Sequence, residues 1–346
     1  KQAAYYKGNY GCYTWRLSRE GKVDMSRIVV ALGGNALQSD PENKSAEAQL
    51  KACKKTSKFI VDLIEKGHEV VIAHGNGPQV GQLVATYEAA ASISDKNIIM
   101  PFPECGAMSQ GYIGYQLQQS IKGEMQRRGL KKEVATLITQ VLVDENDPGF
   151  KNPTKPVGSF FTKEQARELM DEKGYVMKED SNRGWRRVVP SPIPEAIIEE
   201  SEIKTLVGSG CVVITVGGGG VPVIDEGDGI LKGVPAVIDK DFASEKVAEM
   251  LNADILLILT AVEQVAVNFG KPDQKNITNM TSLQARNYIE KGHFAPGSML
   301  PKIKAALAFV EKKPGRKTII TSLEKAREAI EGTAGTTIYN INARFA

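Results

Sequence analysis

The chain has 346 residues, of which 42% are hydrophobic, and its formal net charge is +3. This length can bury a large core in one α/β domain or in two lobes, and no apolar run approaches the roughly 18 residues of a membrane-spanning helix. Residues 1–24 hold five basic and two acidic residues and therefore carry all of the excess charge, so the remaining chain gives no support for a nucleic-acid or membrane partner.

Residues 1–24 also differ from the rest in composition. Five aromatic residues lie among lysine and glycine without a helical or strand period, and no apolar core of a secretory signal follows the basic residues. We interpret the segment as an added leader before a native start at Met25, with a disordered native arm as the alternative. The four cysteines lack CxxC spacing, which is typical of a reducing compartment and predicts a cytoplasmic protein.

From Arg27 onward, short apolar runs alternate with amphipathic stretches of helical period. In the first half the pattern predicts strands at 28–32, 69–73 and 134–143, and helices at 46–65, after Pro78, and at 109–128. In the second half it predicts helices at 195–207, 241–251, 282–290, 300–311 and 323–331, strands at 211–216, 255–259 and 318–321, and a hairpin at 228–229. This alternation predicts an α/β fold with a doubly wound, mostly parallel central sheet and helices on both faces, a three-layer sandwich.

One segment, 147–194, interrupts this alternation. It contains six prolines and a cluster of three arginines, with a helical pattern at 163–172 and strand patterns at 175–178 and 186–189. It is too long for a simple linker, so we predict a small inserted subdomain that protrudes from the sheet edge. A lid over the functional site is one interpretation, and a subunit contact or a decoration without a role is the other.

Glycine-rich segments follow three of the predicted strands. They are Gly33-Gly34-Asn35, Gly75-Asn76-Gly77 and Gly217–Gly220. Glycine allows backbone N–H groups to approach an anion, and the carboxyl edge of a parallel sheet is where such sites form. The pattern predicts one site for a phosphoryl group that moves and one for a nucleotide that carries it. Neither the dinucleotide fingerprint nor a P-loop motif occurs.

Three lysines lie beside turns or at predicted helix starts, namely Lys155, Lys240 and Lys302. Each could face a phosphate held by nearby amides, although a solvated surface position is the commoner role of a single lysine. Asp241 could position these lysines or contact a metal, with a plain helix N-cap as the alternative. The three histidines lack the spacing of a zinc site.

Taken together, six motifs resemble the carbamate kinase branch of the amino-acid kinase fold family, over the chain from about Met25 to its end. They are 31–37, 74–81, 107–112, 152–156, 217–220 and 295–299. The resemblance implies reversible phosphoryl transfer between ATP and carbamate, giving ADP and carbamoyl phosphate. It also implies Mg²⁺ with the nucleotide, a homodimer, and ATP synthesis in arginine catabolism through the arginine deiminase pathway.

The resemblance also assigns roles to residues. It implies that carbamate and the migrating phosphoryl group are held by Gly33, Gly34, Asn35, Gly75, Asn76 and Gly77. It implies that the nucleotide phosphates are held by Gly217, Gly218, Gly219, Gly220, Lys240 and Lys302. Asp241 would orient the lysines, Mg²⁺ would be held mainly by the phosphates, and Lys155 would supply the cation that other family members carry beside the first glycine pair.

These roles divide 25–346 into an acceptor and phosphoryl half at 25–146, the protruding subdomain at 147–194 and a nucleotide-binding half at 195–346. Two alternatives stay open. The first is another amino-acid kinase, similar to acetylglutamate or uridylate kinase and acting on a larger acceptor. The second is a non-catalytic nucleotide-binding sensor on the same fold.

Overall fold

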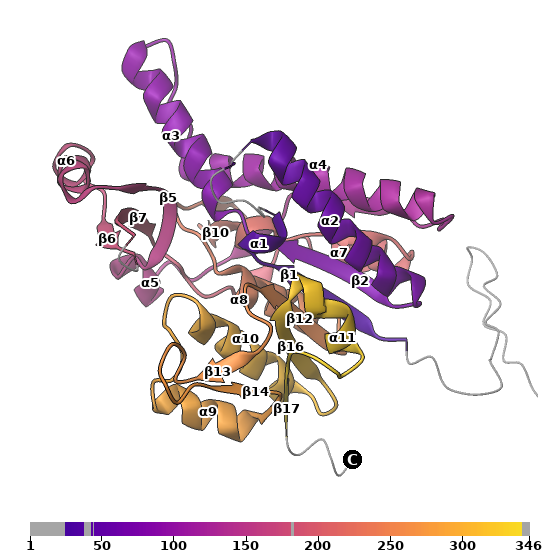
Figure 1. Cartoon of the computed structure of the whole chain (residues 1–346). Coiled ribbons are helices and arrows are strands. Elements are labelled where there is room, and N and C mark those ends of the chain that lie inside the picture. Colours follow the sequence, from indigo (N-terminus) through magenta and orange to yellow (C-terminus); the bar gives the residue numbers. More distant parts are fainter. Residues whose placement is uncertain (1–24, 38–42, 44, 181–182, 341–346) are drawn as a thin grey trace, which may run out of the picture.

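The structure is a computed structural model that describes residues 25–37, 43, 45–180 and 183–340; the predictions for residues 1–24 lie outside this part. At its centre is a mixed sheet (Figure 1). The strand order is β15 (Asn279–Thr281), β17 (Thr336–Tyr339), β16 (Lys317–Ser322), β12 (Ile255–Thr260), β1 (Arg27–Leu32), β2 (Glu69–His74), β9 (Val212–Ile214) and β3 (Val134–Thr136). The six strands from β16 to β3 are parallel, and only β17 and β15 run the other way.

Helices cover both faces of this sheet because its strands are apolar on both sides. In β1, Ile28, Val30 and Leu32 face one apolar cluster, whereas Val29 and Ala31 face the other. The first cluster includes side chains of α1 (Gly34–Leu37), α2 (Ala46–Glu65), α4 (Phe102–Arg127) and α11 (Ala326–Ile330). The second includes those of α7 (Glu200–Gly208), α8 (Lys240–Met250), α9 (Ser282–Glu290) and α10 (Met299–Lys312). The predicted three-layer α/β sandwich is therefore confirmed.

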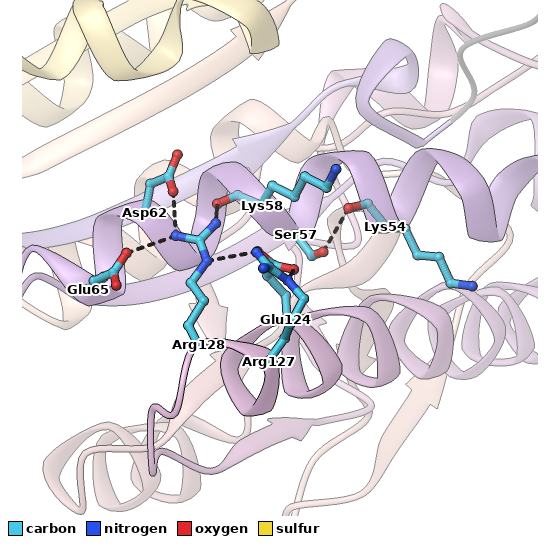
Figure 2. A network of polar contacts seen from close by, with 8 residues as sticks. All are labelled: Lys54, Ser57, Lys58, Asp62, Glu65, Glu124, Arg127 and Arg128. Atoms are coloured by element: carbon cyan, nitrogen blue, oxygen red, sulfur yellow. Dashed lines mark hydrogen bonds and ion pairs between the residues drawn. The ribbon is translucent and has the colours of Figure 1, made fainter.

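An arginine just after α4 fastens that helix to α2 (Figure 2). The Arg128 guanidinium, only 15% exposed, donates to Asp62 at 2.5 Å, to Glu65 at 2.9 Å and to Glu124 at 2.7 Å. A further donor reaches the carbonyl oxygen of Lys58 at 3.1 Å. Because one planar group bonds both helices, it fixes their relative position on this face of the sheet.

Several predicted elements differ from the structure in their extent. The single strand predicted at 134–143 is divided between β3 of the central sheet and β4 (Gln140–Leu142) of a second sheet. The division falls at Thr139, whose backbone N–H donates to the side-chain oxygen of Gln110. Its carbonyl oxygen accepts from the Gln110 amide and from the backbone N–H of Val221 in the second sheet. The helix predicted at 195–207 begins only at Glu200, because residues 196–197 pair with β4 as strand β8 (Ala196–Ile197).

The second sheet also contains β10 (Val221–Asp225) and β11 (Leu231–Gly233), which form the hairpin predicted at 228–229. The predicted helix at 109–128 extends further toward the N-terminus, since α4 begins at Phe102 after Pro101. Four short elements complete the part of the chain after residue 195: η1 (Gly217–Gly219), β13 (Val265–Val267), β14 (Lys275–Ile277) and η2 (Leu323–Lys325).

The inserted segment forms a small sheet of its own. Its antiparallel strands are β5 (Lys155–Phe161), β7 (Trp185–Val189) and β6 (Met177–Glu179), with helices α5 (Pro148–Lys151) and α6 (Lys163–Lys173). In Figure 1 it lies at one end of the molecule beside α3 (Gly77–Ile93). A Cβ atom on Gly81 of α3 would lie 2.1 Å from the Cα atom of Gly158 in β5, so the two backbones touch. In the described part of the chain, no helix is long and apolar enough to cross a membrane.

Candidate active site

Three glycine-rich strand ends meet at one edge of the central sheet. Neighbouring strands β1, β2 and β9 are parallel, so the residues that follow them lie at the same edge. The N–H of Gly33 donates to the carbonyl oxygen of Leu259 at 3.1 Å, and that of Gly75 donates to Leu32 at 3.1 Å. A Cβ atom on Gly33 would lie 2.6 Å from the Leu259 oxygen, so only glycine permits this close approach.

The third glycine segment folds into the tight turn η1 against the loop after β2. Gly218 has a φ of +68°, and a Cβ atom there would lie 2.1 Å from the side-chain nitrogen of Asn76. Even the preceding Val216 adopts a left-handed φ of 44°. Both the backbone conformation and the close approach of Asn76 therefore require glycine at position 218. The turn lies in direct contact with the Asn76 side chain.

Lysines from three distant segments gather around two aspartates. Asp239 caps α8 by accepting from the backbone N–H of Asp241 at 2.9 Å, and its other oxygen accepts from Lys155 at 2.5 Å. Asp241, only 1% exposed, accepts from Lys240 at 2.8 Å and from Lys302 at 2.8 Å. Three ammonium groups against two carboxylates leave this cluster with one excess positive charge.

Burial and charge pairing shift the titration of the cluster. Burial alone would raise the pKa of Asp241, but the adjacent Lys240 and Lys302 hold it below its usual range. Burial would lower the pKa of Lys240, yet Asp241 and Asp239 raise it. Burial and the neighbouring Lys240 lower the pKa of Lys302, with Asp241 opposing them. The pKa of Lys302 is thus lowered, whereas that of Lys240 is raised.

A cavity of about 200 Å³ lies beside this cluster. The chemistry-bearing part of its wall consists of Gly34, Gly75, Asn76, Gly77, Gly218, Lys155 and Lys240. The N-terminus of α3, at Gly77, also opens here, and a helix N-terminus favours negative charge. Backbone amides, the carboxamides of Asn76 and Gln79, and two ammonium groups around a small volume suit a compact oxygen-rich anion.

The predicted site residues do not all reach this cavity. Gly33, Gly217, Gly219 and Gly220 pack behind its wall; for example, a Cβ atom on Gly219 would lie 2.2 Å from the carbonyl oxygen of Ile238. Lys302 joins the cluster through Asp241, and the side chain of Asn35 lies outside the described part of the structure.

The alternative that Asp241 is a helix N-cap is wrong, because the cap is Asp239. Sequence analysis missed Asp239 as a site residue altogether. An available signal was its place at the start of α8, next to Lys240, which is where an N-cap aspartate is expected. Its second carboxylate oxygen is the partner of Lys155.

Residues at 109–110 support the site from α4. Ser109 accepts a hydrogen bond from the Asn76 side chain at 2.7 Å and donates to the carbonyl oxygen of Gly106 at 2.6 Å. Gln110 binds both backbone groups of Thr139, whose hydroxyl accepts from the N–H of Val216 at 3.1 Å. The motif at 107–112 therefore fixes Asn76 directly and the glycine turn through Thr139.

His74, at the end of β2, is buried and uncharged. Its Nδ1 lies 2.9 Å from the Gly75 carbonyl oxygen, which can only accept, so Nδ1 carries the proton. Burial lowers the pKa of His74 from 6.5 to about 4, against the opposing effect of that hydrogen bond. Between these two pH values the unfolded chain binds a proton at this site that the folded chain does not.

We therefore expect His74 to reduce stability as the pH falls from 6.5 to 4. The shift corresponds to a loss of about 3 kcal/mol in the free energy of unfolding, complete near pH 4 and absent above pH 6.5. Urea unfolding across this range should show the extra loss in the unmodified protein but not in His74→Asn, whose amide can still donate to Gly75. Parallel pH profiles for the two proteins would contradict the assignment.

Comparison with known proteins identifies the family. The model of the amino acid kinase family matches residues 26–322. Carbamate kinase of Clostridium perfringens (strain 13 / Type A) is 57% identical over 312 residues, which are 90% of this chain and 99% of that protein. The chain belongs to the amino acid kinase family, in its carbamate kinase branch. Members of this branch are phosphotransferases, and so is this chain.

Other members of the carbamate kinase branch agree in sequence and in structure. Carbamate kinase of Pyrococcus horikoshii is 50% identical over 312 residues, covering 90% of this chain and 98% of that protein. The solved structure described as carbamate kinase from Giardia lamblia bound to AMP-PNP is 40% identical, with a TM-score of 0.83. The match covers 92% of this chain and the whole of the Giardia lamblia chain. The resemblance expected from the six motifs is thereby confirmed.

Proposed function

We propose that the chain catalyses reversible transfer of a phosphoryl group between ATP and carbamate, giving ADP and carbamoyl phosphate. The observation that best supports this proposal is the small cavity whose wall brings together Gly34, Gly75, Asn76, Lys155 and Lys240. Its volume of about 200 Å³ suits a compact acceptor such as carbamate better than acetylglutamate or uridylate. The relatives and the solved structure named above bear the name carbamate kinase.

The residues of the cavity can stabilise the transition state without a covalent intermediate. During phosphoryl transfer, negative charge spreads over the equatorial oxygens, and positioned N–H and ammonium groups stabilise it. We assign this role to the amide at Gly34, to the amide at Gly77 at the N-terminus of α3, and to the ammonium groups of Lys155 and Lys240. Carbamate is already an anion, so it can attack without a general base.

Lys302 and the glycine turn complete the proposal on the nucleotide side. Lys302 shares Asp241 with Lys240, so both ammonium groups are held in fixed positions relative to the cavity. Fixed charges need no reorganisation when the reaction occurs, which is the main source of electrostatic catalysis. We propose that Lys240, Lys302 and the turn Gly217–Gly220 bind the nucleotide phosphates.

We propose that Mg²⁺ enters with the phosphates of ATP. Among the described residues, no three His, Cys, Asp or Glu side chains form a group that could hold a metal ion. Asp239 and Asp241, the two carboxylates of the cluster, both have lysine partners. These residues fit an ion that is coordinated mainly by phosphate oxygens and that neutralises their charge.

The test is ATP formation from ADP and carbamoyl phosphate, with Mg²⁺ added and withheld. We expect turnover that depends on Mg²⁺, and in the forward direction no transfer from ATP to acetylglutamate or uridylate. Transfer to either larger acceptor, without ATP formation from carbamoyl phosphate, would favour another amino-acid kinase. ATP binding without transfer to any acceptor would favour a nucleotide sensor.

Three further properties belong to the same proposal. A homodimer fits the edge strand β3, beside which the large side chains of Tyr115 and Ile138 are exposed. A cytoplasmic location fits the free thiols of Cys53, Cys105 and Cys211. Synthesis of ATP in arginine catabolism is the role that the family resemblance implies, and metabolite concentrations would set the direction.

A further inference from the structure

A second cavity, of about 260 Å³, lies between α3 and the protruding subdomain. Its wall is mainly apolar, with side chains of Val84, Phe102, Val157, Phe161 and Leu169. Val157 also lines the active-site cavity, so β5 takes part in both walls. No role in the proposed reaction uses this second cavity.

Four polar side chains stand together in the wall of the cavity. Glu88 of α3 pairs with Lys173 at 2.9 Å and with Arg187 at 3.6 Å, and it accepts a hydrogen bond from the Tyr175 hydroxyl. Burial, reinforced by Glu88, raises the pKa of Tyr175 to about 12, so the phenol keeps its proton. Burial alone would raise the pKa of Glu88, but Tyr175 and the two cations lower it. Two cations against one carboxylate leave an excess positive charge.

The excess charge is available at Arg187. Its guanidinium lies 3.7 Å from the centre of the Tyr175 ring and 5.8 Å from that of Phe102, and the side chain is 23% exposed. Within the described part of the chain, it donates no hydrogen bond, and its one polar contact is the 3.6 Å pairing with Glu88. A guanidinium fork is suited to a carboxylate, which it can bind through two parallel bonds.

We propose that this cavity binds a small monocarboxylate with an apolar body. The carboxylate bonds to Arg187, and the body packs against Val84, Phe161 and Leu169. A cation would meet the excess positive charge, and a neutral ligand would leave the guanidinium donors without an acceptor. A mainly apolar pocket with a few convergent polar groups is the usual form of a small-molecule site.

Binding there should reach the active site through β5. An occupant packs against α3 and β5 together and so restrains β5, the strand that begins with Lys155 and carries Val157 of the shared wall. We therefore expect occupancy to lower the KM for carbamoyl phosphate. The expected change in KM rests on the proposed function, whereas the binding of the monocarboxylate to the cavity does not.

The experiment titrates the full chain with hexanoate, hexanol and hexylamine, which share one apolar body and differ in the polar end. Calorimetry should show saturable binding of hexanoate, with hexanol and hexylamine at least tenfold weaker. Arg187→Met should weaken hexanoate binding at least tenfold. Arg183→Met, a change of the same kind on an exposed arginine of the subdomain, should leave it unchanged.

A second variant keeps Arg187 and fills the cavity with a larger side chain. Ala85, an exposed residue of α3 that lines the cavity, can become leucine with little loss of helix propensity. Ala85→Leu should abolish hexanoate binding, and in the unmodified protein saturating hexanoate should lower the KM for carbamoyl phosphate at least twofold. The proposal would be overturned if hexanol bound as tightly as hexanoate, or if Arg187→Met and Ala85→Leu both bound hexanoate normally. It would also be overturned if saturating hexanoate left the KM for carbamoyl phosphate of an active enzyme unchanged. If no turnover is observed at all, calorimetry still tests the site.

Discussion

Replacing Lys155, or Lys302 on the nucleotide side, with alanine is expected to lower kcat for ATP formation by about 10²–10³, the scale of losing one positioned donor around the transferring phosphoryl group. Lys302 is fixed by Asp241 at 2.8 Å and Lys155 by Asp239 at 2.5 Å, so each ammonium group is held in place before the substrate arrives. Steady-state kinetics with ADP and carbamoyl phosphate measures the loss.

The matched control is Lys163→Ala, an exposed lysine at the start of α6 in the same subdomain as Lys155. We expect its kcat to equal that of the unmodified enzyme. Near-normal turnover in both Lys155→Ala and Lys302→Ala would remove these lysines from the mechanism. A rise in KM alone, with kcat intact, would reduce their role to binding.

Replacing Asp241 with alanine is expected to destabilise the fold by about 3–5 kcal/mol, the usual cost of leaving buried charge without its partner. Two buried ammonium groups, those of Lys240 and Lys302, would lose their shared carboxylate. Urea unfolding at pH 7 measures the change. Asp171→Ala, on the exposed face of α6, serves as the control and should stay within about 0.5 kcal/mol.

The pH dependence of this variant adds a second check. Without Asp241, the lysines should release protons in the folded state below their ordinary pKa, so the unfolded chain binds more protons than the folded chain. Stability should then rise with pH, and the deficit should shrink between pH 7 and 10. A deficit that is small at pH 7 or independent of pH would show that the two ammonium groups do not depend on Asp241.

Much of the fold could be predicted because its signals are local. The helices at 46–65 and 282–290 were predicted with the bounds that the structure gives, since each has a clear apolar period. The glycine segments after β1, β2 and β9 could be placed together because parallel strands end at one edge. The apolar periods and the meeting of parallel strand ends together predict the edge of the sheet at which the site lies.

The remaining features depend on contacts between distant segments. The break at Thr139 depends on Gln110, a side chain 29 residues away that bonds both backbone groups of that residue, and on Val221, whose N–H also bonds its carbonyl oxygen. Asp239 and Asp241 look alike in sequence, and only the approach of Lys155 and Lys302 from other segments gives each its partner. The position expected for Lys155 came from the family resemblance, because nothing local to 153–156 indicates which way its side chain points.

The contact between Gly81 and Gly158 defines which parts of the molecule can move as one body. A side chain on Gly81 would collide with the β5 backbone and separate helix from strand. At Gly158 the φ of +74° disfavours any residue other than glycine. A rotation that opens the entrance to the site while keeping this contact has to carry α3 along with the inserted sheet. The hinge then lies at the ends of α3 as well as at the ends of the insertion.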